Sequence, residues 1–175
     1  MRISAPTFFP RLVALLGVLM LAGCANYHLG TGGPLPFKTL YVPPARVEAS
    51  VPQAAAPVTE MLRQSLLQEG SVRLADQSDA DATLQVTLTD FAPGVDATQP
   101  TNTLNAVSFT LMLEATCTLV DNRSGKVYFK DRKIQVRQLA YVQNGVSFTE
   151  SEYQAMPRLA RDMAEQIKDA VVSAW

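Results

Sequence analysis

The clearest feature of the chain is a strict alternation of apolar and polar residues over positions 106–120. The intervening positions from 108 to 118 are polar except Met112. Because successive side chains of a strand point to opposite faces, this pattern predicts a long strand in a sheet that is buried on one face only. The apolar members are Val107, Phe109, Leu111, Leu113, Ala115, Cys117 and Leu119.

A turn signal at 121–125 predicts a hairpin that leads into a return strand over 126–138. The phase of the return strand changes, since its apolar residues are odd-numbered at first and even-numbered from Ile134 onward. A slip of one residue reverses the two faces of a strand. We therefore expect a bulge between Lys130 and Lys133.

Residues 57–69 follow a helical period, with Pro57 suited to the first turn and Gly70 to the end. This helix falls between a short strand at 38–42, ended by two prolines, and an alternating strand at 83–89. The remaining segments are expected to be loops at 46–56, 76–81 and 92–103 and a short extended piece at 72–74.

The last segment, 149–174, has one apolar stripe and predicts a second helix. Thr149 and Glu152 fit a capping box at its start. Pro157 allows two interpretations: either the helix begins nearer Gln154, or it kinks at the proline. The order of elements is then β-α-β-β-β-α. It predicts an α+β two-layer sandwich, with two helices on one face of a four-stranded, mainly antiparallel sheet. The long crossover allows the first strand to lie parallel to a neighbour.

Residues 1–23 have the layout of a cleavable export signal. Arg2 and Arg11 give a positive start, and an apolar run of about ten residues follows. As a helix this run is roughly 15 Å long, too short for a hydrocarbon core of about 30 Å. No other stretch is apolar for long enough, so we expect no membrane-spanning helix after processing.

The sequence Leu-Ala-Gly-Cys at 21–24 resembles a lipobox, in which the thiol takes a diacylglycerol group and the chain is cut just before it. The alternative is an ordinary signal peptide with a chance cysteine. With a lipobox, Cys24 carries diacylglycerol and an N-acyl chain, 24–36 is a lipidated tether, and 37–175 is the folded domain. Ala25 stands where inner-membrane retention favours Asp, so the resemblance implies the outer membrane.

Without Arg2 and Arg11 the mature chain has 13 basic and 16 acidic residues, a net charge of −3, which disfavours nucleic-acid binding.

With Cys24 lipidated, Cys117 has no partner within the chain. It falls on the apolar side of the 106–120 strand, so we expect a buried, inert thiol. Intermolecular pairing is the alternative.

The residue types in the sequence offer few candidates for a catalytic site. His28 is the only histidine, so no His-containing triad or two-His metal site is possible in the domain. Asp76, Asp79 and Asp81 resemble a fragment of a calcium loop, but the required Gly and closing Glu are missing, and a solvated loop is the simpler interpretation. We expect no enzyme, no metal and no cofactor apart from the acyl chains.

Basic side chains crowd the predicted last hairpin, opposed by Asp121 and Asp131. One interpretation is a solvated strand face whose lysines protect a sheet edge. The other is a site for anionic groups such as the phosphates of a lipid headgroup. The candidate residues are Arg123, Lys126, Lys130, Arg132, Lys133 and Arg137.

In their order along the chain, these segments resemble the LPS-assembly lipoprotein family, LptE. The resemblance covers nearly the whole mature chain, and it rests on short motifs at 24–30, 38–44, 79–84, 88–91, 121–127 and 159–167. There are two departures from the family pattern. One is an extra residue between Cys24 and Tyr27, and the other is the short Ala/Pro loop before the first helix.

The resemblance implies a two-helix, four-stranded domain that plugs the outer-membrane β-barrel LptD. Such a domain faces the periplasm or the barrel lumen, helps the barrel fold, and helps deliver lipopolysaccharide to the outer leaflet. The basic residues of the hairpin are then candidate lipopolysaccharide contacts. The alternative function is that of an auxiliary lipoprotein in a transport or cell-wall machine without a barrel partner. A lipoprotein enzyme is a third hypothesis, which the poor acid–base inventory disfavours.

Overall fold

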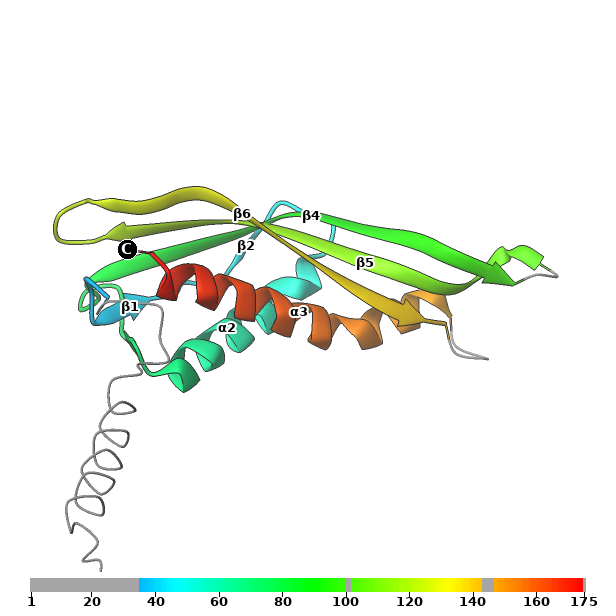
Figure 1. The fold of residues 1–175 in the computed structure, drawn as a ribbon, viewed down its shortest axis with the longest axis horizontal. Helices are drawn as coiled ribbons and strands as arrows, with labels where there is room; N and C mark the ends of the chain where they lie inside the picture. Colours follow the sequence, from blue (N-terminus) through cyan, green and yellow to red (C-terminus); the bar gives the residue numbers. More distant parts are fainter. Residues whose placement is uncertain (1–34, 100–101, 143–146, 175) are drawn as a thin grey trace, which may run out of the picture. The chain divides into compact units, whose positions relative to one another are not determined.

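Two helices lie on one face of a six-stranded sheet, which gives the predicted α+β class and two layers (Figure 1). The computed structural model describes residues 35–99, 102–142 and 147–174. The strand order is β3-β1-β4-β5-β6, and β2 also pairs with β4. The predicted four strands omit two strands of two residues each. The strand β2 (Arg46–Val47) lies in the predicted loop at 46–56, and β3 (Arg73–Leu74) lies in the predicted extended piece at 72–74.

The long strands form an antiparallel meander of β4 (Ala82–Gln99), β5 (Asn102–Asp121) and β6 (Val127–Tyr141). The predicted loop at 92–103 is therefore wrong, because β4 and β5 both run into it. Pro93 is tolerated because it lies beyond the stretch of β4 that pairs with β2. At this point β4 pairs with β5 on one side, so the missing N–H of the proline can face the other side.

The short N-terminal strand β1 (Thr39–Tyr41) runs parallel to both of its neighbours, β3 and β4. The crossover through the first helix makes this possible, as predicted. That helix, α2 (Ala55–Glu69), follows a short 3₁₀ turn and ends at Gly70, whose φ of 74° is the left-handed conformation that glycine adopts without strain.

The second helix, α3 (Phe148–Val172), begins one residue before the predicted start. Its N-cap is Ser147, whose hydroxyl accepts a 3.1 Å hydrogen bond from the backbone N–H of Glu150, so the predicted cap at Thr149 is wrong by two residues. Pro157 lies inside the helix, which rules out a start near Gln154.

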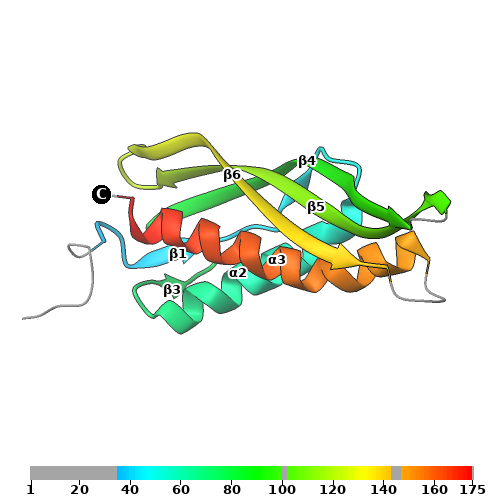
Figure 2. The same cartoon turned by 45° about the vertical axis from the view of Figure 1, so that its right-hand side comes forward.

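The core lies between the sheet and the two helices, which run beneath it (Figure 2). On β5 the odd-numbered side chains from 109 to 119 are fully buried, whereas the even-numbered ones from 110 to 120 are only partly buried. The alternation in the sequence thus predicts which face of this strand meets the helices. The largest fully buried side chains include Leu62, Leu88, Phe109, Leu159, Met163 and Ile167.

The predicted bulge in β6 is confirmed. Cys117 pairs with Arg132 and Leu119 with Phe129, so Thr118 alone faces two residues of β6, Lys130 and Asp131. Asp131 has a φ of 50°, and its N–H donates a 3.1 Å hydrogen bond to the hydroxyl of Thr118. This side-chain bond replaces a ladder bond that the bulge interrupts.

Candidate functional site

The six predicted basic residues are all exposed, but they do not form a single cluster. Arg123, Lys126 and Lys130 lie at or near the β5–β6 turn. The other three lie along the regular part of β6, where Arg132 pairs with Cys117 and so belongs to the helix-facing side. Lys133 and Arg137 pair with even-numbered residues of β5 and so belong to the opposite side.

The turn is held by Asp121. One of its carboxylate oxygens accepts hydrogen bonds from the backbone N–H groups of Arg123 and Ser124, at 3.0 and 2.7 Å, and from the Ser124 hydroxyl at 2.8 Å. These donors lower the pKa of Asp121. The carboxylate opposing the basic residues is therefore engaged in shaping the turn.

Asp81 ties the turn to the start of the sheet. One of its carboxylate oxygens accepts hydrogen bonds from the backbone N–H groups of Lys38 and Thr39, both at 3.0 Å, and the other forms a 2.7 Å ion pair with Arg123. Hydrogen bonding from Lys38 is the largest cause of its lowered pKa, followed by bonds from Thr39. Arg123, one of the predicted anion-binding residues, thus already has a carboxylate partner.

The acidic loop therefore has a structural role that the sequence analysis missed. Asp81 accepts from residues 42 and 43 positions away, and no local pattern signals such a contact. Within the described ranges, no group of three or more His, Cys, Asp or Glu side chains is placed to hold a metal ion.

The face of the sheet opposite the helices is polar. On β4 and β5 it carries mainly threonines, such as Thr83, Thr87 and Thr116, which are partly exposed. Charges on this face pair loosely: the amine of Lys133 lies 3.5 Å from the carboxylate of Glu114, and the Lys133 side chain stays 73% exposed. This face offers hydrogen-bonding groups over a broad area.

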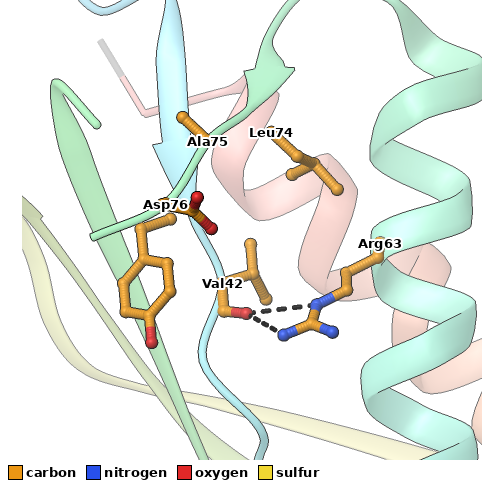
Figure 3. Close-up of a pocket in the computed structure, with 6 residues that line it drawn as sticks. Val42, Arg63, Leu74, Ala75 and Asp76 are labelled. Carbon is orange, nitrogen blue, oxygen red and sulfur yellow. Dashed lines mark hydrogen bonds between the residues drawn. The ribbon is translucent and has the colours of Figure 1, made fainter. Parts of the chain in front are cut away.

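A hollow of about 370 Å³ opens where β1 and β3 end, lined partly by Leu74 and Asp76 (Figure 3). Arg63 reaches into it from α2. The guanidinium donates two hydrogen bonds to the backbone carbonyl of Val42, at 3.2 Å from Nε and 2.6 Å from Nη2. The Arg63 guanidinium thus provides hydrogen-bond donors for the carbonyl just before Pro43. Its contacts fix the backbone at this point and do not indicate how a ligand would bind.

Cys117 is fully buried on the helix-facing side of β5, as predicted. Burial raises the pKa of its thiol to about 12, and the nearby positive charge of Arg132 lowers it by a smaller amount. The thiol is therefore protonated and shielded at neutral pH.

These features define a small α+β domain whose fold also occurs in bacterial lipoproteins. A minor lipoprotein from Acinetobacter baumannii has the same fold, with 18% identity, a TM-score of 0.50, and coverage of 80% of this chain and 94% of that one. A protein from Xanthomonas campestris has 12% identity, a TM-score of 0.55, and coverage of 82% and 88%. A lipoprotein B from Nitrosomonas europaea has 12% identity, a TM-score of 0.52, and coverage of 84% and 88%.

The family follows from the sequence. The model of the lipopolysaccharide-assembly family LptE matches residues 37–171, and the chain belongs to that family. No curated protein matches the sequence. Among the described residues, no helix is long and apolar enough to cross a membrane.

Proposed function

We propose that this chain is the lipid-anchored partner of an LptD-type outer-membrane barrel in lipopolysaccharide assembly. The observation that carries the proposal is the family match over 37–171. The proposal includes export by residues 1–23, lipidation of Cys24, a tether at 24–36 and residence at the outer membrane. The role is binding rather than catalysis, in keeping with the family.

The open face of the sheet supports a barrel partner. The interior of a membrane barrel presents polar side chains. A face rich in threonine, with Gln85 and Gln135 among its exposed members, can form hydrogen bonds with such a wall.

The basic residues support contact with phosphates of lipopolysaccharide. A hydrogen bond between charged groups contributes about 1.5–3 kcal/mol. Arg123 already pairs with Asp81, so Lys126 and Lys130 are the turn residues with the most charge to offer. The Lys126 amine lies 5.1 Å from the centre of the Tyr128 ring, and the residue is exposed to solvent. Arg132, Lys133 and Arg137 remain candidates further along β6.

The test of the barrel partnership is a photo-crosslinking pull-down from outer membranes, with the reactive residue at Thr116 on the open face. Recovery of a large, heat-modifiable barrel protein is expected after irradiation. A matched sample without irradiation controls for co-sedimentation. Recovery of periplasmic machinery without any barrel would instead favour the auxiliary lipoprotein.

The test of the lipopolysaccharide contact is charge reversal. Lys126→Glu with Lys130→Glu should weaken binding in a salt-dependent manner. The matched control reverses Arg46 and Arg161, which are exposed on β2 and α3. Equal binding by the two double variants would remove the turn from the proposed site.

A further inference from the structure

Strand β6 forms a long free edge of the sheet. Its ladder partner in the described structure is β5 alone. From Ser108 paired with Tyr141 to Cys117 paired with Arg132, the ladder runs through ten consecutive pairs without a register shift. In an antiparallel ladder every second residue directs its N–H and C=O away from the partner strand. The outer side of this segment therefore presents a regular row of backbone donors and acceptors.

Protection of this edge is uneven. Natural sheets guard their edges with bulges and charged side chains, and β6 has its bulge at Lys130 and Asp131, before the regular segment begins. Beyond Arg137 the strand carries no charge. There Leu139 is 47% exposed and Tyr141 is 66% exposed. The second half of the edge is thus open to pairing with another strand.

Side chains along the edge follow a definite pattern. On the side facing away from the helices the order is cation, amide, cation, aliphatic, aromatic, from Lys133, Gln135, Arg137, Leu139 and Tyr141. No acidic residue occurs between positions 132 and 141. A strand laid beside β6 would therefore meet two positive charges four residues apart, and then two apolar side chains.

The helix-facing side of the edge has room for side chains as well. Two hollows lie between β6 and α3. One, of about 340 Å³, is lined by Ile134 and Ala170 among others, and the other, of about 250 Å³, by Ala140 and Ala155 among others. Figure 2 shows β6 crossing over α3 along this line. Alternate side chains of an added strand would point toward these hollows.

We propose that the β6 edge binds an extended segment of another protein as an added strand. The segment has two carboxylates four residues apart, next to Lys133 and Arg137, and apolar side chains next to Leu139 and Tyr141. A second copy of this chain is the wrong occupant, because its β6 edge has no acidic residue between positions 132 and 141 to face these cations. The inference does not require the barrel partner, but it assigns to a peptide the Lys133 and Arg137 side chains that are also candidates for lipopolysaccharide phosphates.

The probe is a fluorescent nine-residue peptide of alternating pattern, with two Glu four residues apart and then Val and Phe on the same face. It is synthesised in both sequence orders, because either strand direction is compatible with an edge. Binding to the full-length chain in detergent is measured by anisotropy. The matched probe has Lys in place of both Glu. The acidic probe should bind about tenfold more tightly, and high salt should remove the difference.

Backbone pairing is tested with two isomers of the acidic probe, N-methylated on alternate residues. An added strand points only one of the two sets of N–H groups at β6. One isomer should lose binding and the other should keep it. If both bind equally, the segment does not add as a strand and the proposal is wrong.

The chain side is tested with Lys133→Glu combined with Arg137→Glu, which should weaken the acidic probe about tenfold and favour the Lys probe. The control reverses Arg46 and Arg161 and should leave binding unchanged. Unchanged binding in the β6 variant would overturn the charge match. A wild-type dimer in sedimentation that the β6 variant dissociates would make a second copy the occupant and overturn the proposal.

Discussion

Burial decides the chemistry of Cys117. Its thiol is fully buried and its pKa is raised to about 12, so a maleimide should not label it at pH 7 in the native chain. Labelling should become rapid in urea. Cys117→Asp should lower the free energy of unfolding by several kcal/mol, because it buries an uncompensated charge. Cys117→Ala should cost far less. Fast native labelling would show that the strand face is accessible.

Asp81 should make stability depend on pH. Its folded pKa lies below the ordinary value of an aspartate, so its contribution is present above that ordinary value and is lost as the pH falls through the folded pKa. Asp81→Asn should lower the free energy of unfolding at pH 7, and the difference from wild type should shrink below about pH 4. Urea unfolding at pH 7 and pH 3 checks this. Asp79→Asn, in the same loop, is the control and should leave the free energy of unfolding at pH 7 nearly unchanged.

For single helices and strands, the apolar–polar pattern predicts the structure best where one side of the segment is buried along its whole length. The fully alternating β5 and the bulge in β6 both follow from the phase of apolar residues, since a shifted phase would expose the core. The length of β4 does not follow. A second bulge near Leu88 and Asp90 changes its phase, and Pro93 and Gly94 are ordinarily loop residues. Pairing with β5 outweighs these local preferences.

The bulge predicts that glycine substitutions at neighbouring positions change stability in opposite directions. Asp131 has a φ of 50°, which costs a residue with a Cβ about 1–2 kcal/mol, although Asp tolerates it better than most. Asp131→Gly should raise the free energy of unfolding by about 0.5–1 kcal/mol, and Asp131→Val should lower it by about 1–2 kcal/mol. Lys130→Gly is the control and should be destabilising. Urea titrations measure the stability of all three variants. A destabilising Asp131→Gly would contradict the backbone strain at the bulge.

Across the whole domain, the sequence predicts the core side better than the polar side. The six basic residues are close in sequence, but the bulge and the strand alternation divide them between the turn and two sides of β6. Only the register shows that Arg132 and Lys133 belong to opposite sides. The contact between Asp81 and Arg123 likewise joins residues 42 positions apart, which no local pattern could indicate.

The last prediction concerns the lipidation of Cys24. Near the start of the described residues, Phe37 is 2% exposed and packs with its ring centre 5.5 Å from that of Tyr128. If Cys24 is lipidated, an acyl anchor lies 13 positions before this buried residue. More than one acyl chain gives stable attachment to a membrane. Cys24→Ser should therefore abolish palmitate labelling and shift the protein out of the outer-membrane fraction. Cys117→Ala, the other cysteine substitution, should keep both the label and the location. Palmitate retained by the Cys24→Ser chain would show that the lipobox assignment is wrong, whatever the barrel and lipopolysaccharide tests give.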